Sequence, residues 1–187
     1  FNADNIIALC REAEEQGVQA VGFPELCLTG YTCSDLFLHS TLLEGAKQQL
    51  VRIARETAEM DMLILVGVPI AVRGSLYNCA AVLHKGSILG LIPKRNIPNY
   101  TEFYEMRHFT EASADLCEEV EIGGEWVSLC PRTVFTCKDM PAFCVAAEIC
   151  EDLWAPDPPS TYHALAGANL IVNLSASDET TGKDIYR

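Results

Sequence analysis

The stretch of sequence that decides the fold is Phe-Cys-Val-Ala-Ala-Glu-Ile-Cys-Glu-Asp-Leu-Trp, residues 143–154. Its first half is rich in small and branched apolar residues, which predicts a buried strand over residues 143–149. Cys150 and acidic residues follow where this strand ends, and reacting groups are often displayed at that edge of a sheet. A cysteine can also be simple core filling, because free cysteine packs as a small apolar side chain. Other parts of the chain must therefore decide whether Cys150 is a nucleophile.

Composition indicates a globular protein with a small-molecule or protein partner. The chain has 187 residues, of which 49% are hydrophobic and 21% charged, enough for one domain with a substantial core. Its net charge of −13 argues against binding to nucleic acid or to an anionic membrane, since both need basic surfaces. No apolar run of about 18 residues predicts a membrane span.

The cysteines indicate a reducing, cytoplasmic environment. There are nine, an odd number without a Cys-x-x-Cys pair, and several lie inside apolar runs. The four histidines do not have the spacing of a structural zinc site, so no metal is expected.

Predicted helices and strands alternate along the chain. Helical spacing of apolar residues predicts a helix that is capped by Asn2 or Asp4 and stops at Gly17, and further helices at 40–59 and 161–166. Residues 111–133 are interpreted as an excursion over the surface with a strand pair around Gly123-Gly124. Strands are predicted at 18–23, 62–69, 76–84, 87–92, 134–137, 143–149 and 169–174. This alternation, with hairpins included, favours a layered α/β sandwich with mixed sheets.

Three reactive side chains each follow a predicted strand: Glu25, Lys94 and Cys150. Parallel neighbouring strands bring their carboxyl ends to one edge, so the three can converge there. An ammonium lowers the pKa of a nearby thiol and a carboxylate can take its proton. Together with the backbone N–H after Cys150, Lys94 would stabilise an oxyanion. The pattern predicts acyl transfer by a cysteine that needs no histidine.

Three segments resemble the signatures of the nitrilase (carbon-nitrogen hydrolase) superfamily. They are Phe-Pro-Glu-Leu-Cys-Leu-Thr-Gly-Tyr at 23–31, Ile-Pro-Lys-Arg-Asn-Ile-Pro-Asn-Tyr-Thr-Glu-Phe at 92–103 and Glu-Ile-Cys-Glu-Asp-Leu-Trp at 148–154. Within that superfamily the chain is most similar to the glutamine amidotransferase domains of glutamine-dependent NAD synthetases. This resemblance rests on four sequence motifs: Gly-Tyr-Thr-Cys-Ser-Asp-Leu-Phe, Pro-Asn-Tyr-Thr-Glu-Phe-Tyr-Glu, Cys-Glu-Asp-Leu-Trp and Asn-Leu-Ser-Ala-Ser.

The resemblance implies a four-layer α-β-β-α sandwich, of which this chain is expected to be an incomplete portion. It also implies hydrolysis of the glutamine side-chain amide through a cysteine thioester. Glu25 is then the general base, Cys150 the nucleophile and Lys94 the cation that stabilises charge. Glu102 matches a second glutamate that many members place near this triad.

Substrate contacts are implied at Tyr31, Tyr100, Glu102, Glu151 and Ser177. A glutamine pocket needs a carboxylate for the ammonium, donors for the carboxylate and an apolar sleeve between them. Glu151, Ser177 and the loop tyrosines offer these groups. Tyrosines in loops often only pack, and Glu151 can simply cap a turn, so both interpretations stay open.

The resemblance also predicts what lies outside this chain. Residues 1–187 contain no Gly-rich phosphate-binding loop, so ATP and magnesium are expected only in a synthetase domain that these residues lack, and no cofactor is expected for the glutaminase step. Because the sequence opens without Met and ends on Tyr-Arg, it is expected to be truncated at both ends. Glutamine, the synthetase domain of the same protein and further copies in a homo-oligomer are the expected partners.

Two alternatives remain at this stage. The chain can be a free-standing nitrilase-like amidase that acts on another amide or carbamoyl compound. It can also be an inactive scaffold that keeps the fold for oligomer contacts.

Overall fold

The computed structural model describes residues 1–178 and 180–186. Its α-helices are α1 (Asn2–Glu15), α2 (Ser40–Glu56), α3 (Pro159–Leu165) and α4 (Lys183–Tyr186), with 3₁₀ helices η1 (Ser34–Leu38), η2 (Glu105–Arg107) and η3 (Cys150–Trp154). Its strands are β1 (Ala20–Gly22), β2 (Leu63–Val72), β3 (Ser75–His84), β4 (Ser87–Pro93), β5 (Glu118–Ile122), β6 (Glu125–Leu129), β7 (Phe135–Thr136), β8 (Cys144–Ile149) and β9 (Leu170–Leu174).

The strands form two sheets. The larger sheet has the order β1-β2-β3-β4-β6-β5 and the smaller sheet the order β7-β8-β9. In the larger sheet β1 is parallel to β2, while β2–β3 and β3–β4 are antiparallel. In the smaller sheet β8 and β9 are parallel. Strands β7 and β8 are antiparallel. Both sheets are therefore mixed, as the alternation of elements predicts.

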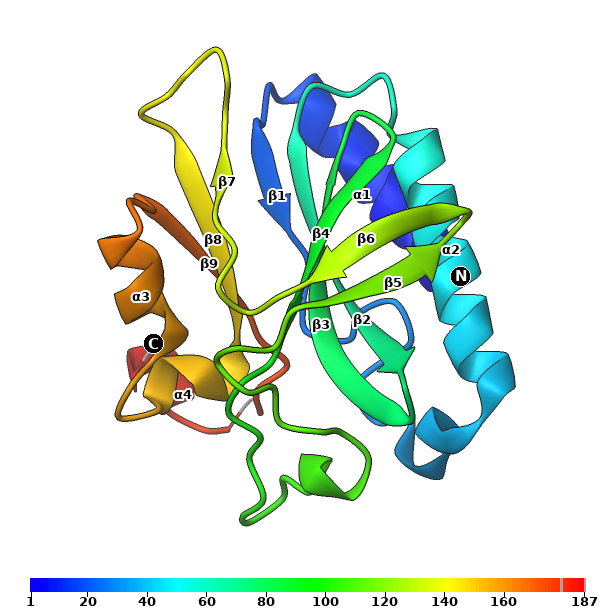
Figure 1. Ribbon diagram of the computed structural model, residues 1–187, viewed down its shortest axis with the longest axis vertical. Coiled ribbons are helices and arrows are strands. Elements are labelled where there is room, and N and C mark those ends of the chain that lie inside the picture. The colour runs from blue at the N-terminus through cyan, green and yellow to red at the C-terminus, as the bar shows by residue number, and fades with distance from the viewer. Residues whose placement is uncertain (179, 187) are drawn as a thin grey trace.

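Helices cover the outer faces and the two sheets pack against each other (Figure 1). The apolar sides of α1 and α2 contribute Ile6, Cys10, Leu50 and Ile53 to the core that they share with the larger sheet. A second core lies between the sheets. It contains Leu65, Ala80, Val82 and Ile92 from the larger sheet and Ala147, Ile149 and Leu174 from the smaller one. Helix α3 packs on β8. The four-layer α-β-β-α sandwich is confirmed.

The segment 111–133 is more than a surface excursion. Residues 118–122 and 125–129 form the predicted strand pair, but β6 also pairs with β4 through Leu91 and Leu129. Side chains alternate between the two faces of these strands, so Val120, Ile122 and Val127 are buried while Glu119, Glu121 and Glu125 are exposed. The interpretation of residues 111–133 as an excursion was therefore wrong for these strands, which extend the larger sheet.

No helix among the described residues has both the length and the apolar character that crossing a membrane requires.

Candidate active site

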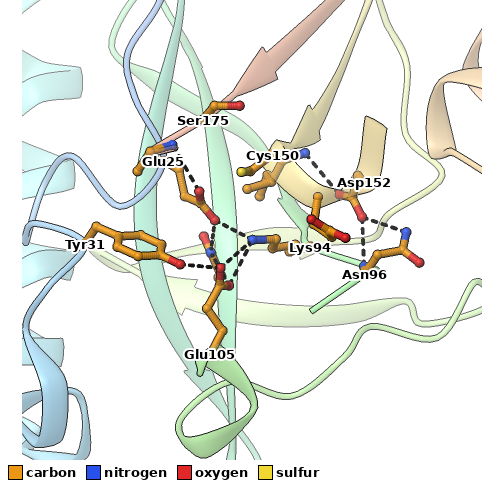
Figure 2. A network of polar contacts seen from close by, with 12 residues as sticks. Glu25, Tyr31, Lys94, Asn96, Glu105, Cys150, Asp152 and Ser175 are labelled. Atoms are coloured by element: carbon orange, nitrogen blue, oxygen red, sulfur yellow. Dashed lines mark hydrogen bonds and ion pairs between the residues drawn. The ribbon is translucent and has the colours of Figure 1, made fainter. Parts of the chain in front are cut away.

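The site lies where β1, β4 and β8 end. Strands β1 and β4 run in the same direction but are separated by β2 and β3, and β8 belongs to the other sheet. The argument from parallel neighbouring strands was therefore wrong in its detail. Glu25, Lys94 and Cys150 meet because the two sheets pack with these strand ends together (Figure 2).

Glu25 is held by a loop that crosses β2 in very close contact. Gly67 permits this, because a Cβ atom at that position would lie 2.3 Å from the Leu26 nitrogen and 2.5 Å from the Pro24 oxygen. The loop is fixed to the strand by the Leu28 N–H, which donates to the Gly67 oxygen at 3.2 Å. Glu25 is only 2% exposed.

Lys94 is fully buried between two carboxylates (Figure 2). Its Nζ donates to Glu25 Oε1 at 2.6 Å and to the two carboxylate oxygens of Glu105 at 2.8 and 2.9 Å. Burial alone would lower the pKa of Lys94, but the charges of Glu25 and Glu105 outweigh it and raise that pKa. Lys94 is therefore a permanent cation in this site.

Two neutral side chains and one backbone N–H also belong to the network. Asn78 Nδ2 donates to Glu25 Oε1 at 2.7 Å, and the Tyr31 hydroxyl donates to Glu105 Oε1 at 2.7 Å. The Ala176 N–H donates to Glu25 Oε2 at 3.2 Å. Burial raises the pKa of Glu25, and the nearby charge of Glu105 adds to this, while Lys94 acts in the opposite direction.

The second glutamate beside Lys94 is Glu105, not Glu102. Glu105 is buried on η2, whereas Glu102 is exposed three residues earlier. A hydrogen bond with Asp178 holds the pKa of Glu102 low, at about 2. The match of Glu102 to that position was wrong because residues 102–105 do not form a regular helix, so spacing alone does not tell which acid turns inward.

Cys150 begins η3 at the end of β8, with its backbone in the left-handed region at φ 46°. Such a φ is strained for a residue with a Cβ, and this turn displays the thiol at the sheet edge. Figure 2 shows the sulfur on the side of Cys150 that faces Glu25. Burial, followed by the charge of Glu25, raises the pKa of Cys150 to about 11 despite the opposing effect of Lys94. The expected lowering by the ammonium does not dominate, so the resting group is a neutral thiol.

Asp152 connects the Lys94 strand end to the Cys150 turn. Its Oδ2 accepts the Ile149 N–H at 3.0 Å. Its Oδ1 accepts the backbone N–H groups of Arg95 at 3.1 Å and Asn96 at 2.8 Å, and the Asn96 side-chain amide at 2.9 Å. Asp152 is 1% exposed. Sequence reasoning missed it, together with Asn78 and Glu105.

A cavity of about 510 Å³ opens beside this network. Three predicted substrate contacts line it: Tyr31, Glu102 and Ser177. Tyr100 and Glu151 are not among its lining residues. They contact each other, with the Tyr100 hydroxyl donating to Glu151 Oε2 at 2.8 Å. The described residues include no group of three or more His, Cys, Asp or Glu side chains that could hold a metal ion.

Comparison with protein families gives a match over nearly the whole chain. The carbon-nitrogen hydrolase family matches residues 2–186. The chain belongs to this family. Strand ends that supply Glu25, Lys94 and Cys150 are thus part of a carbon-nitrogen hydrolase fold.

The similar carbon-nitrogen hydrolases with curated names are much longer than this chain. Glutamine-dependent NAD(+) synthetase of Mycobacterium tuberculosis is 37% identical over 97% of this chain, which spans 27% of that protein. The enzyme of the same name from Thermotoga maritima is 35% identical over 100% of the chain, which spans 29% of it.

Solved structures agree on the fold. A glutamine-dependent NAD(+) synthetase from Cytophaga hutchinsonii superposes with a TM-score of 0.86 at 29% identity, covering 99% of this chain and 29% of that one. An amidase from Nesterenkonia superposes with a TM-score of 0.71 at 19% identity, covering 98% and 61%. At that identity the likeness shows the fold alone.

Proposed function

We propose that this chain hydrolyses the side-chain amide of glutamine and supplies ammonia to a synthetase domain of a longer protein. The observation that supports this most is the convergence of Glu25, Lys94 and Cys150, with Lys94 Nζ 2.6 Å from Glu25. The similarity to glutamine-dependent NAD(+) synthetases supports glutamine as the substrate. The chain spans 27 to 30% of the length of those relatives, which agrees with a synthetase domain outside these residues.

In the first half of the reaction the Cys150 sulfur attacks the amide carbon of glutamine. The thiol proton passes to Glu25, whose burial raises its pKa toward that of a useful base. Lys94 and the backbone N–H after Cys150 stabilise the oxyanion. The tetrahedral species then breaks its carbon–nitrogen bond, and the leaving nitrogen takes the proton from Glu25 to depart as ammonia.

In the second half water attacks the thioester. Glu25 takes a proton from the water, the carbon–sulfur bond breaks, and Cys150 recovers a proton as glutamate leaves. Glu105 accepts hydrogen bonds from Tyr31 and Lys94, and it keeps the Lys94 ammonium between two carboxylates in both halves of the reaction. No cofactor takes part in these steps. ATP and magnesium would act in the synthetase domain, where ammonia converts deamido-NAD to NAD.

The cavity offers a place for the amino-acid end of the substrate. Ser177 provides a hydroxyl, and Glu102 a carboxylate for the α-ammonium, while Phe103 and Leu26 supply apolar walls. Tyr100 and Glu151 do not line this cavity. In this proposal they form the rim near Cys150, because Glu151 directly follows Cys150 and its carboxylate accepts the Tyr100 hydroxyl.

The test is release of ammonia and glutamate in equal amounts from glutamine by the full-length protein. Cys150→Ala should lower the rate by at least about 1,000-fold. Cys144→Ala is the matched control, because Cys144 lies at the start of the same strand and is equally buried. An active Cys150→Ala variant would refute the nucleophile. Turnover of simple aliphatic amides in preference to glutamine would favour a free-standing amidase instead.

A further inference from the structure

Two thiols outside the active site face each other across the ends of β5 and β6. Glu118 is paired with Leu129 in this antiparallel ladder. Extending the register by one residue places Cys117 opposite Cys130. The segments before Cys117 and after Cys130 are still adjacent, as the ion pair between Arg132 Nη1 and Asp115 Oδ1 at 3.6 Å shows. The ladder and the ion pair therefore bracket the two cysteines.

The position of Cys130 is fixed by its backbone. Its N–H donates to the Leu91 oxygen of β4 at 3.0 Å, and its oxygen accepts the Thr133 hydroxyl at 3.0 Å. Cys117 is exposed and Cys130 half-buried, so a small reagent can reach the pair. The neighbouring Cys130 thiol raises the pKa of Cys117, which agrees with their opposed positions at the end of the ladder.

The other seven cysteines are placed differently. Cys137 lies opposite Phe143, to whose oxygen its N–H donates at 3.2 Å. Cys10, Cys79, Cys144 and Cys150 are buried. The thiols of Cys27 and Cys33 donate to backbone oxygens, of Gly67 and Thr29 respectively.

We propose that Cys117 and Cys130 are a modification site, and that they form a reversible intramolecular disulfide on reaction with a low-molecular-weight disulfide such as oxidised glutathione. The thiolate of one cysteine attacks this reagent and expels one glutathione thiolate, giving a mixed disulfide. The second cysteine then attacks the protein sulfur and expels the other glutathione. Two protein thiols become one disulfide, and oxidised glutathione becomes two molecules of reduced glutathione.

This link would close the β5–β6 hairpin. Because the Cys130 N–H is bonded to β4, it would also fix the hairpin to the strand that ends at Lys94. The reaction does not use Cys150, so formation of the disulfide does not depend on the proposed glutaminase activity.

The sequence offers a direct test. Trypsin cleaves after Arg107 and Arg132, and the peptide 108–132 contains Cys117 and Cys130 but no other cysteine. The folded full-length protein is treated with oxidised glutathione, its free thiols are alkylated, and the digest is analysed by mass spectrometry. We expect this peptide to lose both alkylation sites and to be two hydrogens lighter than its reduced form. Dithiothreitol should restore both sites.

Cleavage of that peptide after the acidic residues between the two cysteines should leave its halves linked. Cys117→Ser and Cys130→Ser are the matched variants, and each should leave the remaining thiol alkylated or carrying one removable glutathione. A wild-type peptide that stays fully alkylated, carries two separate glutathione groups or is linked to another cysteine peptide would overturn the proposal.

Discussion

Replacing Asp152 by alanine should damage both stability and catalysis, although we assign Asp152 no contact with substrate. Its carboxylate accepts the N–H groups of Ile149, Arg95 and Asn96 and the side-chain amide of Asn96. Three of these four donors are backbone groups that cannot turn to another acceptor. Lys94 directly precedes Arg95, and Cys150 directly follows Ile149, so the carboxylate fixes the distance between Lys94 and Cys150.

The magnitude follows from this set of bonds. Each hydrogen bond to a charged group contributes about 1.5–3 kcal/mol, and a buried donor left without an acceptor costs about 1–3 kcal/mol. Burial raises the pKa of Asp152, which means that burying its charge is unfavourable. Removing the carboxylate removes this cost and offsets part of the loss. A net loss of about 4 kcal/mol is expected for Asp152→Ala. Asp152→Asn keeps one acceptor oxygen and loses mainly the Ile149 bond, so a loss of about 1–2 kcal/mol is expected.

Catalysis should change in kcat rather than in KM. A displacement of about 1 Å between reacting groups can cost about 100-fold in rate, and Asp152 does not line the cavity. The assays are urea unfolding and steady-state glutamine hydrolysis, with Asp139→Ala as a control because that aspartate is exposed. An Asp152→Ala variant with unchanged unfolding, or with a raised KM at constant kcat, would refute this reasoning.

Gly67→Ala should unfold the Glu25 loop or the protein, because the new Cβ would lie 2.3 Å from the Leu26 nitrogen; circular dichroism during heating measures this. Alkylation of Cys150, measured by mass spectrometry, should become faster as the pH rises toward about 11, because the thiolate is the reactive form. Since burial raises this pKa above its ordinary value of 9.0, the neutral thiol stabilises the fold below pH 9.0 and this stabilisation is lost through about pH 11. Tyr31→Phe, which removes a 2.7 Å bond to Glu105, should lower the rate about 10-fold with folding retained; a rate equal to wild type would contradict the network.

Much of the fold follows from local patterns. The helix from Ser40 and the hairpin around Lys85-Gly86 form as predicted, because helical apolar spacing and a turn between apolar runs are properties of neighbouring residues. The pairing of β6 with β4 was not predicted. It depends on contact between Leu91 and Leu129, which are far apart in sequence and carry no local signal of their partnership.

The sequence by itself determined the family resemblance and put Glu25, Lys94 and Cys150 at strand ends, because those residues lie beside short motifs that can be read directly. Only the tertiary structure decided their surroundings. Whether Glu102 or Glu105 turns toward Lys94, how Asn78 reaches Glu25 and what Asp152 holds together all depend on side chains from separate strands meeting at one point. The protonation state of the Cys150 thiol is likewise decided only by the tertiary structure. Burial and distance to two opposite charges set it, and neither quantity exists until the two sheets have packed.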